Sequence, residues 1–192
     1  CRRNTAPCIA YVSWKIKKCN PRANIVITPS DHVVKDVKLF SQAVSECMEF
    51  TAETDSIVTL GIRPTAPETG YGYIEADLSY ASSCSQNIFR VDSFKEKPSL
   101  DLAKQYVEKN NYFWNAGIFI WSVQTIVNAF RVYQPGMAKL FEEMTPQFGT
   151  PEEKDKIAEV YDQIESISVD YAIMEKAEEI FVYQASFDWS DV

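Results

Sequence analysis

The chain has 192 residues, of which 46% are hydrophobic and 24% are charged, and its formal net charge is -8. This length suffices for one well-buried core and is short for two independent domains. The acidic balance argues against a nucleic acid or an anionic membrane as a partner, because a broad basic surface would need clustered Lys and Arg. We therefore expect any phosphate ligand to be held locally, by a few lysines, backbone N–H groups or a divalent cation.

The cysteines suggest neither a zinc site nor a disulfide framework. No CxxC pair is present, His32 is the only histidine, and the five cysteines are Cys1, Cys8, Cys19, Cys47 and Cys84. We expect free, mostly structural thiols. The sequence also has no run of about 18 apolar residues and no charged-then-apolar leader. These features predict a cytoplasmic enzyme or binding domain without a membrane partner.

The first part of the chain alternates helical and strand patterns. Apolar residues at helical spacing predict helices over 6–18 and 36–53, and β-branched runs predict strands over 25–27 and 56–62. Strands that alternate with helices of this length imply βαβ units and a mostly parallel sheet. The predicted fold class is therefore α/β.

A loop rich in Pro and Gly follows, and the pattern then changes. Two strands over 71–75 and 87–94 are expected to form an antiparallel insertion. A helix over 100–109 with Ser99 as its cap and an apolar strand over 113–121 come next. The remaining elements are predicted helices over 122–133, 136–144, 152–164 and 169–177, the last capped by Ser168, and a strand over 180–185.

The segment Thr28–His32 is the most informative, because it directly follows a buried strand. Strand ends carry the ligand site in many α/β sheets. Asp31 could hold Mg²⁺ there while phosphate oxygens complete the coordination. The alternative is that Asp31 caps the next turn, and spacing alone leaves both open. His32 is interpreted as a packed, hydrogen-bonded side chain.

A second candidate is Phe94-Lys95-Glu96-Lys97-Pro98. In a regular strand Glu96 and Lys97 would point to opposite faces, so both can serve one ligand only if the strand bends or ends there. Pro98 makes such an end plausible. The functional interpretation is a carboxylate for sugar hydroxyls beside an ammonium for phosphate. The alternative is a solvated edge, where Lys–Glu pairs contribute little.

Three further positions carry weaker signals. Tyr71-Gly72 would let the backbone approach a ligand, although a tight turn also explains the glycine. Asn115 lies in an apolar strand, so its amide needs partners from the backbone or from ligand hydroxyls. Asp191 is either a second metal ligand or part of a frayed tail.

The motifs in order resemble those of bacterial mannose-1-phosphate guanylyltransferases, which are relatives of other sugar-nucleotide pyrophosphorylases. The matching segments are RRNTAPCIA, ITPSDHVV, GYGYIE, FKEKP, YFWNAGIFIW, SVDYAIMEKA and FDWSDV, and they cover nearly the whole chain. Each segment is weak alone, but their order and spacing are specific. The resemblance implies a Rossmann-like, mostly parallel sheet with flanking helices, of the nucleotide-diphospho-sugar transferase type.

The resemblance also implies a reaction. Mannose 1-phosphate would attack the α-phosphorus of GTP, giving GDP-mannose and pyrophosphate, with Mg²⁺ and without a covalent enzyme intermediate. By resemblance, Asp31 and Asp191 are the metal ligands, and Lys97 holds the sugar phosphate. Catalysis of this kind is largely positioning and electrostatic stabilisation.

The resemblance places further residues at the two substrates. Those expected at the sugar are Glu96, Gly72 with its neighbour Tyr71, and Asn115. Those expected at the nucleotide are Arg3, Asn4 and Thr5. Asp170 could face the sugar site, although its place beside Ser168 suits helix capping equally well.

One departure from the family pattern leads to a further expectation. The family domain begins with a strand and a glycine-rich loop carrying an arginine and a lysine that grip the triphosphate, and these are not in this sequence. We expect residues 1–192 to be a partial nucleotidyltransferase domain that lacks its first strands and is inactive or nearly so alone. An exposed sheet edge would favour association, which allows a homo-oligomer.

Two alternatives stay open at this stage. The enzyme could use another hexose 1-phosphate or another nucleotide, although NTAP, WNAGIFIW and SVDYAIMEK favour mannose and GTP. The chain could instead be a non-catalytic module that binds sugar nucleotides. The presence of both Asp31 and Asp191 argues against the module, because simple binding does not need two metal ligands.

Overall fold

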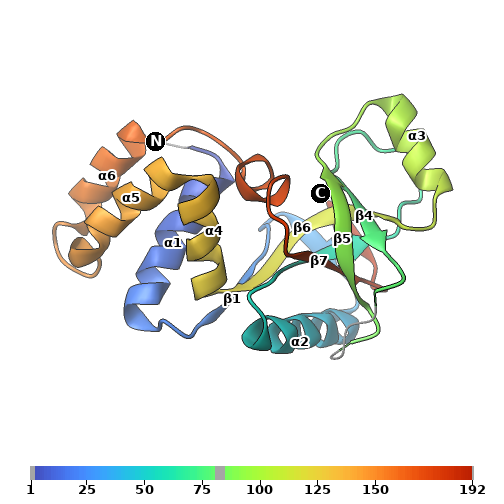
Figure 1. Cartoon of the computed structure of the whole chain (residues 1–192), viewed down its shortest axis with the longest axis horizontal. Helices are drawn as coiled ribbons and strands as arrows, with labels where there is room; N and C mark the ends of the chain where they lie inside the picture. Colours follow the sequence, from blue (N-terminus) through green and yellow to red (C-terminus); the bar gives the residue numbers. More distant parts are fainter. Residues whose placement is uncertain (1–2, 81–84, 192) are drawn as a thin grey trace. The chain divides into compact units, whose positions relative to one another are not determined.

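The computed structural model describes all residues except 1, 2, 81–84 and 192, so Cys1 and Cys84 lie outside the described residues. The chain forms two compact units (Figure 1). A helical unit combines the chain up to Ala23 with Ser122–Ala177, and a sheet unit combines Asn24–Trp121 with the chain from Glu178 onward. Each unit is built from segments far apart in the sequence. The single partial domain expected from the sequence stays a prediction.

The sheet unit contains a six-stranded sheet with the strand order β1-β6-β3-β7-β5-β4. The strands are β1 (Asn24–Ile27), β3 (Ile57–Ile62), β4 (Tyr73–Asp77), β5 (Ile88–Lys95), β6 (Tyr112–Ser122) and β7 (Ile180–Gln184). β4 also pairs with β6, so five of the strands form a closed ring of pairings. The order around this ring is β6, β3, β7, β5 and β4. The predicted strands and the antiparallel β4–β5 insertion are confirmed, with ends shifted by one or two residues.

The predicted fold class, α/β with a central sheet and flanking helices, is confirmed. The expectation of a mostly parallel sheet is wrong for those strand pairs whose register is defined. β3 runs parallel to β7, whereas β3–β6, β4–β5, β4–β6 and β5–β7 are antiparallel. The physical reason lies in the strand order. A crossover helix implies parallel neighbours only if its two strands are adjacent, and β6 lies between β1 and β3.

Two helices belong to the sheet unit, α2 (Val37–Glu53) and α3 (Leu100–Glu108). Both begin at side-chain caps: Asp36 Oδ1 accepts from Leu39 N at 3.1 Å, and Ser99 Oγ accepts from Leu102 N at 3.5 Å. α2 buries one face against the sheet, and its Phe50 ring lies 5.0 Å from the Phe181 ring of β7. The strands whose ends carry the candidate residues thus share one core with α2.

A short two-stranded ribbon completes the sheet unit. Its strands are β2 (His32–Val34) and β8 (Trp189–Asp191), which pair antiparallel with His32 opposite Asp191. Neither strand was predicted from the sequence, because three residues are too few for a recognisable alternation. The frayed-tail alternative for Asp191 is therefore wrong.

β6 contains an irregularity that matters for the site. Between the pairs Thr59↔Phe119 and Gly61↔Asn115, β6 has two more residues than β3. Gly117 lies in this bulge with φ +67°, a conformation that favours glycine. The Asn115 Oδ1 atom accepts from Thr59 Oγ1 at 2.8 Å and from Gly117 N at 3.1 Å. The amide of Asn115 thus stabilises the bulge.

The helical unit consists mainly of four helices that the sequence predicted: α1 (Thr5–Cys19), α4 (Val123–Tyr133), α5 (Pro135–Met144) and α6 (Glu153–Gln163). Trp14 of α1 is buried, with its ring 5.9 Å from Phe130 of α4 and 6.0 Å from Phe141 of α5. Among the described residues, no helix has both the length and the apolarity needed to cross a membrane.

The prediction of a regular helix over 169–177 is wrong. The structure has a π-helical turn there, Asp170–Met174, in which Glu175 N donates to Asp170 O at 3.0 Å. This wider turn allows the consecutive residues Ala172, Ile173 and Met174 all to be buried, which regular helical spacing does not favour.

Candidate functional site

Asp31 and Asp191 come together at one end of the β2–β8 ribbon. The pairing of His32 with Asp191 brings Asp31, the residue before β2, to the same end. His32 Nε2 lies 3.6 Å from Asp191 Oδ1 and 4.0 Å from Asp31 Oδ1. The Asp31 side chain is 70% exposed and that of Asp191 is 43% exposed. Capping of α2 falls to Asp36 rather than Asp31.

These two carboxylates fit a hard divalent cation. Mg²⁺ prefers oxygen ligands and usually keeps several waters or phosphate oxygens beside one or two protein carboxylates. Within the described residues, no cluster of three or more His, Cys, Asp or Glu could hold a metal by itself. An exposed pair of carboxylates therefore suits a cation that substrate phosphates help to hold better than a closed, all-protein site.

His32 is packed and hydrogen-bonded, as the sequence predicted. Its side chain is 13% exposed, and its Nδ1 accepts a hydrogen bond from Trp189 Nε1 at 3.2 Å. The two rings meet edge to face, with their centroids 5.2 Å apart. The contact of Trp189 with His32 was not predicted from the sequence, because a contact between residues 157 positions apart leaves no local signal.

Glu96 and Lys97 lie on the same side of the chain, as the early end of the strand allowed. β5 ends at Lys95, and Lys97 has φ +46°, which is rare for a residue with a side chain and more so before a proline. Lys97 Nζ lies 3.6 Å from Glu96 Oε1, and the lysine side chain is 59% exposed. The backbone thus departs from strand geometry at the position that brings the two charges together.

Gly72 and Asn115 adjoin this pair. Asn115 N donates to Gly72 O at 2.8 Å, which fixes β6 beside residue 72. A Cβ atom at Gly72 would lie 2.6 Å from Glu96 Oε2, so the missing side chain gives the Glu96 carboxylate its room. We call Gly72, Glu96, Lys97 and Asn115 the sugar-side cluster.

Tyr71, the neighbour of Gly72, packs against two tryptophan rings. Its ring centroid is 5.3 Å from that of Trp114 and 5.4 Å from that of Trp189, the second residue before Asp191. Burial, followed by the negative charges of Asp191 and Glu68, raises the pKa of the Tyr71 hydroxyl above its ordinary value. The hydroxyl therefore stays protonated and able to donate a hydrogen bond near Asp191.

The remaining predicted residues belong to the helical unit and make local contacts there. Arg3 Nε donates to Tyr161 O at 2.9 Å, and Asn4 Oδ1 accepts from Thr5 N at 2.8 Å at the start of α1. Thr5 Oγ1 accepts from Val169 N at 2.9 Å, so α1 begins beside the turn that contains Asp170. These contacts give each of Arg3, Asn4 and Thr5 a structural role, and a role at the nucleotide stays a prediction.

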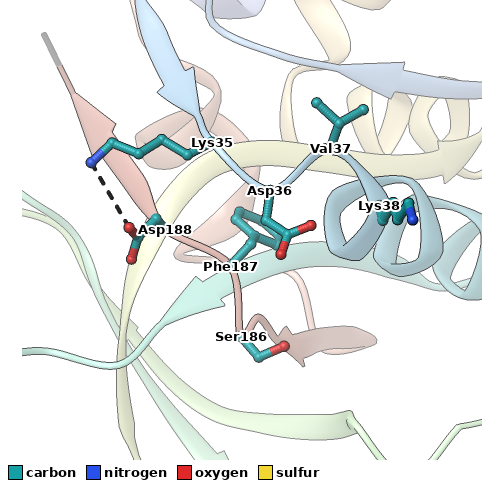
Figure 2. Close-up of a pocket in the computed structure, with 7 residues that line it drawn as sticks. All are labelled: Lys35, Asp36, Val37, Lys38, Ser186, Phe187 and Asp188. Atoms are coloured by element: carbon teal, nitrogen blue, oxygen red, sulfur yellow. Dashed lines mark ion pairs between the residues drawn. The ribbon is translucent and has the colours of Figure 1, made fainter.

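A hollow of about 510 Å³ in the sheet unit was not predicted (Figure 2). It lies between the start of α2 and the segment before β8, and its lining residues are Lys35, Asp36, Val37, Lys38, Ser186, Phe187 and Asp188. Lys35 Nζ lies 3.8 Å from Asp188 Oδ2, the ion pair drawn in Figure 2. The mixture of acidic and basic side chains gives this hollow no clear preference for an anion.

Comparison with known proteins identifies the family. The family model for nucleotidyl transferases matches residues 1–192. The chain belongs to the nucleotidyl transferase family. The resemblance seen in the ordered motifs is thereby confirmed.

Named relatives of this nucleotidyl transferase agree. It is 34% identical over 193 residues to the mannose-1-phosphate guanylyltransferase of Escherichia coli, and 36% identical over 196 residues to the xanthan biosynthesis protein XanB of Xanthomonas campestris pv. campestris. Each alignment covers 99% of this chain, and they cover 41% and 39% of the two relatives. The chain thus spans about two fifths of the length of these relatives.

A solved structure shows the same fold. The protein from Thermus thermophilus named mannose-1-phosphate geranyltransferase superposes with a TM-score of 0.86 at 32% identity. That match covers all of this chain and 53% of the other. The likeness confirms the fold class of this nucleotidyl transferase along its whole length.

Proposed function

We propose that the protein transfers a guanylyl group from GTP to mannose 1-phosphate, giving GDP-mannose and pyrophosphate. One observation carries the proposal: Asp31 and Asp191, 160 positions apart in the sequence, both lie within 4.0 Å of His32 Nε2. The family and the names of the relatives support it. In this proposal the protein acts in the cytoplasm, and the exposed free thiols of Cys8 and Cys19 suit a reducing compartment.

Mg²⁺ is the proposed cofactor, and Asp31 and Asp191 would hold it. When bound, a divalent cation neutralises charge on the phosphates that react and depart. The exposed carboxylates leave room for such phosphate oxygens.

The sugar-side cluster would bind mannose 1-phosphate. The exposed Lys97 ammonium can pair with the sugar phosphate, and the Glu96 carboxylate can accept hydrogen bonds from sugar hydroxyls. Gly72 leaves room for the Glu96 carboxylate, and Asn115 and Tyr71 are proposed to contact the sugar beside it. The same proposal assigns Arg3, Asn4 and Thr5 to the nucleotide and Asp170 to the sugar.

The chemistry proposed is a direct in-line displacement. A phosphate oxygen of mannose 1-phosphate forms a bond to the α-phosphorus of GTP, and the bond from that phosphorus to the bridging oxygen breaks, releasing pyrophosphate. No side chain becomes bonded to the substrate. The residues supply orientation and charge stabilisation, which suffice for phosphoryl-type transfers.

The test is an assay of the full-length gene product with mannose 1-phosphate and each of GTP, ATP, UTP and dTTP. We expect GDP-mannose formation from GTP to exceed the other products at least tenfold and to require Mg²⁺. Faster turnover with another nucleotide would contradict the choice of GTP. Tight binding of GDP-mannose that does not depend on Mg²⁺, without turnover, would show a binding module instead.

A further inference from the structure

We infer that His32 is a positioning residue whose Nε2 proton lies between the carboxylates of Asp31 and Asp191 and keeps both directed at one position. Trp189 would fix the ring in the orientation and tautomer that this requires. The inference rests on the proposed function, because it has a consequence only if the two carboxylates hold a divalent cation.

The hydrogen bond from Trp189 fixes the tautomer of His32. The indole N–H of tryptophan can only donate a hydrogen bond, so the Trp189 contact at 3.2 Å makes His32 Nδ1 an acceptor. A neutral imidazole with Nδ1 as acceptor carries its proton on Nε2. The Nε2 atom then donates and cannot coordinate a metal through a lone pair. His32 is therefore assigned a place beside the cation, not a bond to it.

The carboxylates of Asp31 and Asp191 both lie near His32 Nε2. Like charges at one site repel, which opposes the arrangement that a cation needs. The His32 Nε2 atom, which carries the proton, lies 3.6 Å from Asp191 Oδ1 and 4.0 Å from Asp31 Oδ1, so a positive N–H group is close to both. Both distances exceed a hydrogen bond, so the attraction is electrostatic and the carboxylate lone pairs stay available.

The His32 ring is enclosed by Trp189 and by the bulge at Gly117. The edge of Trp189 meets the His32 ring at an interplanar angle of 86°. The Gly117 bulge lies nearby, since a Cβ atom there would be 3.9 Å from His32 Cε1 and 3.5 Å from Pro29 Cγ. The His32 side chain is consequently well covered, although both carboxylates that it faces are exposed. A covered ring beside exposed ligands is the arrangement expected of a residue that orients them.

Two substitutions of His32 separate this role from simple packing. His32→Phe keeps an aromatic ring and removes both nitrogens, whereas His32→Gln loses the ring and keeps an N–H group at about the same reach. Orientation of the carboxylates predicts that Gln preserves metal binding better than Phe. A packing role predicts the opposite order. Trp189→Phe keeps a smaller aromatic ring but removes the indole N–H, and with it most of the control over the tautomer.

The experiment measures the Kd for Mn²⁺ alone by water-proton relaxation on the full-length gene product. We expect His32→Phe to weaken Mn²⁺ binding about tenfold, within the range found when groups that orient metal ligands are removed. His32→Gln should stay within about threefold of the wild type, with Trp189→Phe between the two. Val33→Ala is the matched control, because the adjacent residue of β2 points to the other face of the ribbon.

The outcomes are distinguishable from failure of the proposed function. Equal Mn²⁺ affinity for His32→Phe and the wild type, or weaker binding by Gln than by Phe, would overturn the role of His32 even if GDP-mannose forms normally. Nitrogen coupling to bound Mn²⁺ in electron spin-echo spectra that disappears in His32→Gln would also overturn it, because His32 would then be a ligand. Absence of GDP-mannose formation by the wild type contradicts the proposed function itself.

Discussion

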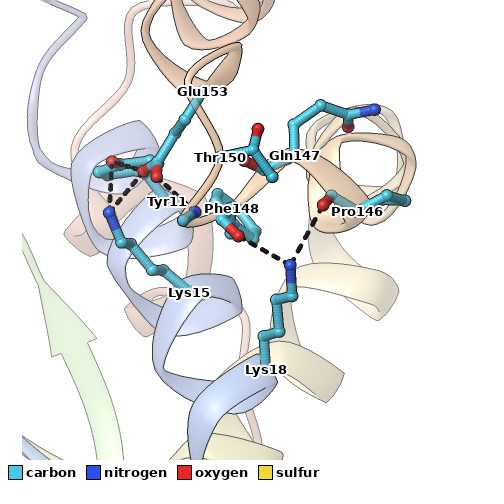
Figure 3. A network of polar contacts seen from close by, with 9 residues as sticks. Tyr11, Lys15, Lys18, Pro146, Gln147, Phe148, Thr150 and Glu153 are labelled. Atoms are coloured by element: carbon cyan, nitrogen blue, oxygen red, sulfur yellow. Dashed lines mark hydrogen bonds and ion pairs between the residues drawn. The ribbon is translucent and has the colours of Figure 1, made fainter.

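Two lysine–glutamate pairs in this molecule differ in what surrounds them. In the helical unit, Lys15 of α1 lies 2.5 Å from Glu153 Oε1, and Glu153 also accepts from the Tyr11 hydroxyl and from Gly149 N (Figure 3). The Glu153 side chain is 13% exposed. The Lys97–Glu96 pair of the sheet unit is longer, at 3.6 Å, with an exposed ammonium and a strained backbone.

The difference indicates that the first pair stabilises the fold, and it agrees with the proposal that the second pair binds a ligand. The contacts of Glu153 with Lys15 and Tyr11 join α1 to the segment 145–153, where Lys18 Nζ also donates to Pro146 O and Phe148 O (Figure 3). Lys97 instead adopts a left-handed conformation that costs about 1–2 kcal/mol and presents its charge to solvent. A costly conformation that supports an exposed charge suggests selection for binding.

The largest effect is expected from Asp191→Asn. The substitution removes one charge from the carboxylate pair and leaves the β2–β8 backbone pairing intact. We expect kcat for GDP-mannose formation to fall about 10²- to 10³-fold, as when one electrostatic group at a reacting centre is lost. Thermal unfolding should be nearly unchanged. Asp188→Asn is the matched control on the same segment, and an equal loss there would contradict the assignment.

Lys97→Gly should separate stability from activity. Glycine adopts φ +46° without a steric cost, so we expect the free energy of unfolding to rise by about 1 kcal/mol. Loss of the ammonium should raise KM for mannose 1-phosphate about 10- to 100-fold. Denaturant unfolding and steady-state kinetics measure the two effects. Lys95→Gly, in the regular strand β5, should lower stability instead. Lower stability in both variants would contradict the conclusion that the backbone at Lys97 is strained.

Gly72→Ala should act more weakly and on one substrate. The new Cβ would lie 2.6 Å from Glu96 Oε2 and displace that carboxylate. We expect KM for mannose 1-phosphate to rise about tenfold, equivalent to about 1.4 kcal/mol, with little change in KM for GTP. Gly70→Ala is the control, since nothing lies within 4 Å of its Cβ position. Equal changes for both substrates would show a general distortion of the site.

Glu153→Gln should leave activity within about twofold of the wild type and lower stability. The Lys15 hydrogen bond, followed by those from Tyr11 and Gly149 N, lowers the pKa of Glu153 from 4.5 to about 2. Because the folded state favours the ionised carboxylate, its contribution is complete above about pH 4.5 and is lost as the pH falls toward 2. Wild-type and variant melting temperatures should therefore converge over that range.

A control for this pH dependence is Glu159→Gln, in the exposed Lys156–Glu159 pair of α6. Pairs of this kind contribute little, so its melting curve should follow the wild type at every pH. If the melting curve of Glu153→Gln also followed the wild type at every pH, the Lys15–Glu153 pair would not stabilise the fold.

Local patterns in the sequence determined most helices, most strands and the helix cap at Ser99. Helical periodicity and capping involve residues a few positions apart, so they can be read without tertiary information. Pro98 likewise indicated the end of β5 near Glu96 and Lys97. The order of the motifs indicated the family, although no single motif was specific.

Only the tertiary structure decided the direction of neighbouring strands, the β2–β8 ribbon and the contact between Trp189 and His32. Each depends on chain segments far apart in sequence, and a strand pattern carries no information about its neighbour. The positive φ of Lys97 was also hidden, because a side chain there is normally disfavoured. Sequence specified the chemical groups, and long-range packing decided which of them meet.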